Sequence, residues 1–120
     1  MTTKRRFRTF MSASEREFRC YQTTKQDEPL AQAGEKLWNA FNILVEIITK
    51  KKIHSFQQIK NASQNLYIQH NDAKFQEAFA GAYDLHKFFY GWTADLSEIE
   101  SEYIKVRALM IEIARKYKAR

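Results

Sequence analysis

The chain contains few residues that form turns or crosslinks. Its 120 residues include three glycines, one proline and one cysteine. So few turn-forming residues exclude an all-β domain, which needs a tight turn after each short strand. The single Cys20 cannot form an internal disulfide, and we expect a buried thiol in a reducing compartment, which predicts a cytoplasmic protein. No apolar run approaches the roughly 20 residues of a membrane-spanning helix, so no membrane association is expected.

The positive charge is concentrated near the N-terminus. Residues 1–25 carry seven basic and two acidic side chains, whereas the other 95 residues carry 13 and 12. Basic residues alternate with aromatics here, and this pattern suits phosphate contacts combined with base stacking. We therefore predict Arg5, Arg6 and Arg8 as nucleic-acid contacts on a mobile basic arm over residues 1–9, the alternative being a solubilising tail. The nearly neutral remainder predicts no second basic patch.

Apolar residues recur with helical periodicity along the rest of the chain. Five segments show this pattern, with short polar connections between them. Short connections favour antiparallel neighbours, so the sequence predicts an all-α, five-helix antiparallel up-and-down bundle that forms a single domain over residues 1–120. The expected helices cover about residues 7–24, 29–50, 55–69, 72–90 and 95–117.

Two local patterns make more detailed predictions. Ser97 and Glu100 have the spacing of a capping box at the start of the last helix, where Asp95 is the alternative cap. Small residues surround Gly34 on the second helix and Gly81 on the fourth. A glycine inside a helix costs about 1 kcal/mol relative to alanine, so a close helix crossing would explain Gly81. We expect the second and fourth helices to form the tightest pair.

The histidines give no clear catalytic arrangement. Small helical ribonucleases place an arginine four to six residues before a histidine, but no arginine lies between Arg19 and Arg107, the interval that holds all three histidines. We therefore predict no catalytic residues, no metal ligands and no cofactor. His86 lies within an apolar stripe, where a buried imidazole needs a hydrogen-bond partner such as Glu35, Tyr90 or a backbone carbonyl. It is either a hydrogen-bonded core histidine or a pocket residue that faces a ligand.

Two stretches of the chain resemble a known family. Residues 31–50, which begin Ala-Gln-Ala-Gly-Glu-Lys-Leu-Trp-Asn-Ala-Phe, are similar to a motif of the archaeal PaREP proteins. Residues 82–92, with Leu85, His86, Phe89 and Tyr90 followed by Gly91-Trp92, are similar to a second motif, and Val106-Arg107-Ala-Leu109 also fits. The resemblance covers about residues 12–118. The family is grouped with the HEPN superfamily of small helical bundles. The resemblance implies an antiparallel bundle that is often a homodimer. Members include toxin-type RNases, nucleotide-binding modules and partners of nucleotidyltransferases.

The resulting hypothesis is a non-catalytic HEPN-like binding module, expected to be a homodimer. Its ligand would be a nucleotide or RNA, or its partner a nucleotidyltransferase. Two alternatives remain: a degenerate metal-free RNase that uses His86 or His54, and a structural homodimer that buries exposed aromatics such as Trp38, Phe88 and Trp92. The predicted ligand-pocket residues are Glu35, Trp38, His86 and Tyr90.

Overall fold

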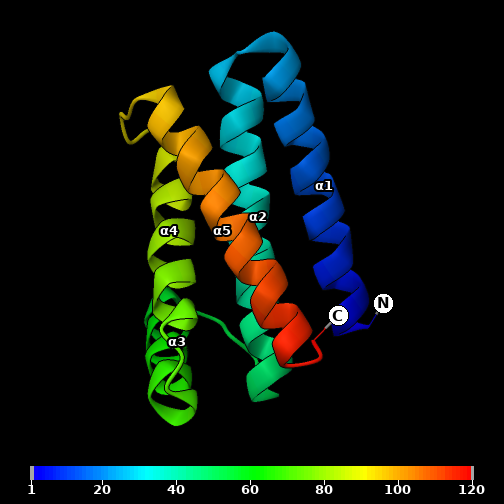
Figure 1. Ribbon diagram of the computed structural model, residues 1–120, viewed down its shortest axis with the longest axis vertical. Helices are drawn as coiled ribbons and strands as arrows, with labels where there is room; N and C mark the ends of the chain where they lie inside the picture. Colours follow the sequence, from blue (N-terminus) through cyan, green and yellow to red (C-terminus); the bar gives the residue numbers. More distant parts are fainter. Residues whose placement is uncertain (1, 120) are drawn as a thin grey trace.

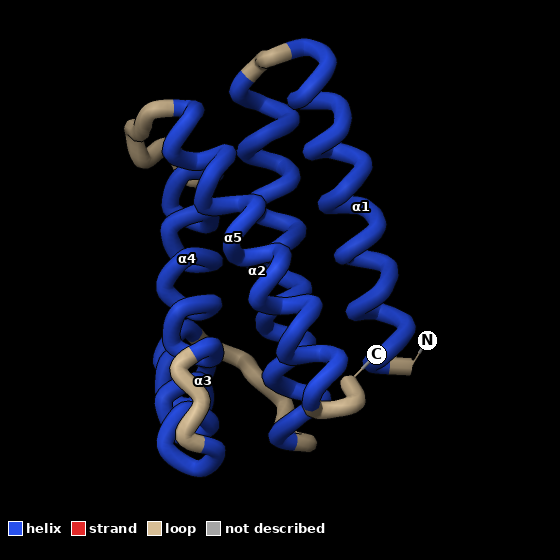
Figure 2. Tube along the Cα trace, in the orientation of Figure 1, coloured by secondary structure: helices blue, strands red, loops and turns tan. Residues whose placement is uncertain are grey.

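The computed structural model describes residues 2–119 as five helices joined by short connections (Figure 1). Throughout the described residues the regular structure is helical (Figure 2), so the predicted all-α bundle is confirmed. Successive long helices run in opposite directions, and α3 lies beside one end of α4. The helices are α1 (Thr3–Thr24), α2 (Asp27–Thr49), α3 (Phe56–His70), α4 (Lys74–Phe89) and α5 (Leu96–Lys116).

The first helix begins earlier than the sequence predicts. The Thr2 side chain accepts a hydrogen bond from the backbone N–H of Arg5 at 3.1 Å, which caps the helix, and Phe7 is buried. Residues 3–9 therefore form the first turns of α1, and the prediction of a mobile arm is wrong for them. Met1 lies outside the described residues.

The remaining helix starts follow local capping chemistry. Ser55 caps α3 by accepting from the backbone N–H of Gln58 at 3.2 Å. Asp95 caps α5 and accepts from the backbone N–H of Ser97 at 2.9 Å. The predicted capping box is therefore wrong, because Ser97 lies inside the helix and donates to the cap instead.

Helix α2 is the centre of the bundle and packs against the other four helices. In contrast, the backbone of α1 lies close only to that of α2. The α1–α2 pair has the most extensive contact, so the expectation that α2 and α4 form the tightest pair is wrong. The buried residues of α2 are Leu30, Ala33, Gly34, Leu37, Trp38, Ala40, Phe41, Ile43, Leu44 and Val45.

The two helix glycines mark different crossings. A Cβ added at Gly34 would lie 3.0 Å from the Cβ of Leu85, so this glycine allows α2 to approach α4. A Cβ at Gly81 would instead collide with Val106 and Glu102 on α5. Gly81 therefore serves the α4–α5 crossing rather than the predicted α2–α4 crossing.

A buried carboxylate joins the start of α4 to the end of α5. Asp72 accepts hydrogen bonds from the backbone N–H of Lys74 at 3.1 Å, from Lys116 Nζ at 3.1 Å and from the Tyr117 hydroxyl at 2.9 Å. Burial alone would raise the pKa of Asp72, but these three donors together lower it to about 2. The charged form of Asp72 therefore stabilises this junction.

Two surface features complete the fold. Cys20 is exposed on α1, so the expectation of a buried thiol is wrong, because the position lies outside the stripe that packs on α2. Across residues 2–119, each helix is too short or too polar to cross a lipid bilayer.

Candidate functional site

Three arginines on α1 surround a surface hollow of about 360 Å³, here called the arginine hollow. Positions three, eight and eleven residues apart share a helix face, so the extension of the helix to Thr3 aligns Arg5, Arg8 and Arg16. The predicted contacts Arg5 and Arg8 line this hollow, whereas the predicted Arg6 does not, because it projects from another side of the helix. The lining residues are Arg5, Arg8, Thr9, Ser12 and Arg16.

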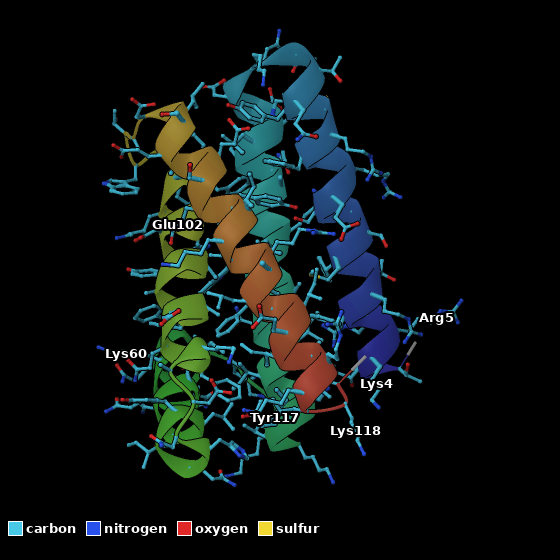
Figure 3. The ribbon with its side chains drawn as sticks, in the orientation of Figure 1. Lys4, Arg5, Lys60, Glu102, Tyr117 and Lys118 are labelled. Carbon is cyan, nitrogen blue, oxygen red and sulfur yellow. The ribbon has the colours of Figure 1, made fainter. Side chains whose placement is uncertain are left out.

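A second basic hollow, the lysine hollow, lies on another side of the first turn of α1. Helices α1 and α2 are antiparallel and nearly equal in length, so the start of α1 lies beside the end of α2. This arrangement brings Lys4 together with Lys50–Lys52 around a hollow of about 460 Å³, which Glu46 also lines. Figure 3 shows Lys4 and Arg5 at the same end of the bundle as Lys118. The prediction that no second basic patch exists is therefore wrong.

A larger hollow of about 610 Å³, here called the α1–α5 hollow, lies between these two helices. Its lining combines apolar side chains with two arginines, a serine and a carboxylate. Arg8 and Ser12 line both this hollow and the arginine hollow, so the two hollows adjoin at these side chains. The lining residues are Phe7, Arg8, Met11, Ser12, Glu15, Arg107, Ile111 and Ala114.

Polar side chains bridge α1 and α5 at one end of this hollow. Arg107 donates from Nε and Nη2 to Glu15 Oε1 at 3.1 and 2.9 Å. At the preceding position of α1, the buried Ser14 hydroxyl donates to the carbonyl oxygen of Ala33 at 2.7 Å and lies 2.8 Å from the Tyr103 hydroxyl. Burial raises the pKa of Tyr103, which therefore remains neutral. The contacts of Glu15 with Arg107 and of Ser14 with Tyr103 therefore join α1 to α5 beside the hollow.

The four predicted pocket residues come together on α2 and α4. His86 Nδ1 lies 2.8 Å from Glu35 Oε2, which confirms the predicted choice of Glu35 as one possible partner. The imidazole stacks on Trp38 with ring centroids 5.0 Å apart and meets the edge of Tyr90 at 4.9 Å. Burial raises the pKa of Glu35, although the hydrogen bond and the charge of His86 oppose this shift. The arrangement orients the ring, and within the described part of the chain the hydrogen bonds of His86 are made by Nδ1 alone.

This histidine cluster is a packed surface rather than an open cleft. The His86 side chain is 29% exposed, whereas Trp38 is 7% exposed and occupies the space between the helices. Trp38 is therefore not available as an exposed aromatic for a dimer, as one alternative supposed, but Trp92 remains 47% exposed. Among residues 2–119, no arginine forms a hydrogen bond or ion pair with His86, and no group of three or more potential ligands is placed to hold a metal ion.

Comparison with known protein families identifies the family of this chain. The model of the archaeal PaREP1/PaREP8 family matches residues 10–110 of the chain. The chain belongs to this family. No curated protein and no solved structure shows a significant match to it.

In this PaREP1/PaREP8 protein the matched segment begins at Phe10, so Arg5 and Arg8 precede it while Arg16 and Arg107 lie within it. Sequence reasoning missed Arg16 because it placed the N-terminal arginines on an arm instead of a helix. The spacing of Arg5, Arg8 and Arg16 would have revealed a common face if the helix had been extended to Thr3. Arg107 gave no local signal, because its role depends on the packing of α5 beside α1.

Proposed function

We propose that this protein is a non-catalytic, HEPN-like binding module for RNA or a nucleotide. The supporting observation is that the arginine hollow and the lysine hollow flank the first turns of α1. Each hollow presents at least three cationic side chains around a concavity, and phosphate groups are the common biological anions that such clusters bind.

The position of the hollows on α1 strengthens this proposal. Partial positive charge accumulates at a helix N-terminus, so the first turn of α1 adds to the potential of Lys4 and Arg5. Among residues 2–119, Glu46 is the only carboxylate in the lining of either hollow, and its Oε2 accepts a hydrogen bond from the backbone N–H of Ile53 at 2.8 Å. The cationic character of the two hollows is therefore largely uncompensated.

The test measures binding of a fluorescently labelled single-stranded RNA by anisotropy over a range of salt concentrations. The double variant Arg5→Gln/Arg16→Gln removes two charges from the arginine hollow. Each lost phosphate contact should lower the slope of log K against log salt by about 0.7, so this variant should lower it by about 1.4. The matched control Lys60→Gln/Lys105→Gln removes two charges from exposed positions that line neither basic hollow.

In Figure 3, Lys60 lies on the opposite side of the bundle from Lys4 and Arg5. The control should therefore retain most of the wild-type slope. Equal effects of the two double variants would show that binding depends on net charge rather than on the arginine hollow. Circular dichroism checks that both variants remain helical.

One observation favours a second candidate function, a degenerate metal-free RNase. The Glu35 carboxylate orients His86, and a carboxylate–histidine pair is a common arrangement for moving a proton. The same labelled RNA tests this candidate, because intact RNA after prolonged incubation argues against cleavage. Cleavage that disappears in His86→Gln, with an unchanged melting temperature, would favour the RNase instead.

A further inference from the structure

We infer that the α1–α5 hollow binds the base of a purine nucleotide whose phosphates lie in the arginine hollow. This inference rests on the proposed function and adds to it a site for the base. Its main support is that the two hollows adjoin at Arg8 and Ser12, which line both of them. A nucleotide likewise joins two different parts, a planar and largely apolar base and an anionic phosphate group.

The lining of the α1–α5 hollow suits a planar heterocycle. The buried side chains of Phe7, Met11 and Ala114 form the base of the hollow, and Ile111 lines it with them. Ile111 is half-buried, so part of its side chain remains available to a ligand. A planar base can pack against such an apolar surface, and a purine covers more of it than a pyrimidine.

The polar groups of the hollow lie at its edges. Arg8 lies on the side shared with the arginine hollow, where it can contact the first phosphate. At the bridged end, Arg107 and Glu15 form an ion pair whose side chains are 40% and 32% exposed. Glu15 Oε1 accepts both hydrogen bonds from Arg107, so Oε2 can accept an N–H from the base. The guanidinium plane of Arg107 offers a further stacking surface.

The size of the hollow also fits this occupant. Small-molecule sites usually measure about 300 to 1,000 Å³, and the α1–α5 hollow measures about 610 Å³. The adjoining arginine hollow adds about 360 Å³ for phosphates. An unbranched polyphosphate could use only the second of these spaces.

Calorimetric titration of the full chain with tripolyphosphate, ATP, GTP, CTP and UTP tests the inference. ATP and GTP should bind about tenfold more tightly than tripolyphosphate, because stacking of one base contributes at least a factor of about five. CTP and UTP should have intermediate affinities. The variant Ile111→Ala removes part of the apolar surface and should weaken ATP and GTP about fivefold while leaving tripolyphosphate unchanged.

The matched control is Leu109→Ala, which shortens another half-buried apolar side chain of α5 that does not line the hollow. It should leave the ratio of ATP to tripolyphosphate affinity at the wild-type value. Equal affinities for ATP and tripolyphosphate would overturn the inference, yet leave the phosphate site of the proposed function intact. A preference for ATP that Ile111→Ala does not change would place the base elsewhere and also overturn it. Failure to bind both nucleotides and RNA would overturn the inference and the proposed function together.

Discussion

The substitution Asp72→Asn provides the sharpest test of the forces that close the bundle. Asparagine preserves the shape of the side chain and can still accept the backbone hydrogen bond from Lys74. It removes the negative charge that accepts hydrogen bonds from Lys116 and Tyr117. The side chain of Asp72 is only 5% exposed, so solvent screens this charge little. The substitution therefore isolates the charge at the junction of α4 and α5.

The shifted pKa gives the expected magnitude. The pKa of Asp72 falls from 3.8 to about 2 on folding. Each unit corresponds to about 1.4 kcal/mol, so the ionised carboxylate should contribute about 2 kcal/mol to the free energy of unfolding at pH 7. Because the folded pKa is the lower one, this contribution is complete well above pH 3.8 and is lost as the pH falls toward 2.

Urea denaturation followed by circular dichroism measures this contribution at pH 7, 5 and 3. Asp72→Asn should lower the free energy of unfolding by about 2 kcal/mol at pH 7 and by about half as much at pH 3. The control Asp84→Asn breaks a half-exposed ion pair with Lys87 and should change stability by less than about 0.5 kcal/mol. A loss in Asp72→Asn that is the same at all three pH values would refute the electrostatic explanation.

Two further substitutions test the packing and the histidine cluster. Gly81→Ala should destabilise the protein by about 1 to 3 kcal/mol in thermal melts, because the new methyl group collides with Val106 and Glu102; a more stable variant would instead show that helix propensity outweighs this crowding. Glu35→Gln should gain stability relative to the wild type as the pH rises above 4.5, because burial raises the pKa of Glu35 and ionisation then opposes folding. A relative loss over that range would mean that the pairing with His86 dominates.

The sequence predicts the number and type of helices because their signals are local. Apolar periodicity identifies each buried stripe, and Ser55 lies where a helix cap is expected. The start of α1 was missed because Lys4, Arg5 and Arg6 interrupt the apolar pattern. The partner of Gly81 was also missed, since small residues signal a close crossing but do not identify the helix that crosses.

The candidate site was only partly predictable for the same reason. Glu35 and His86 could be paired because an imidazole on an apolar stripe requires a polar partner nearby. To predict the lysine hollow from the sequence, one must also align two antiparallel helices of 22 and 23 residues. That alignment places Lys4 beside Lys50–Lys52, which are 46 or more positions away in the sequence.

The way α1 packs explains how a binding surface can exist on a structural helix. The buried residues of α1 are Phe7, Met11, Ser14 and Tyr21, which follow one another at intervals of three, four or seven positions. They therefore form a narrow buried stripe along one side of the helix. The backbone of α1 approaches only that of α2, and side chains such as Ser14 and Glu15 make the contacts with α5. Arg5 and Arg16 are exposed on the remaining face of α1, because the core depends mainly on α2. Substitutions at Arg5 and Arg16 should therefore change binding without loss of the fold, and this separation makes the RNA-binding test decisive.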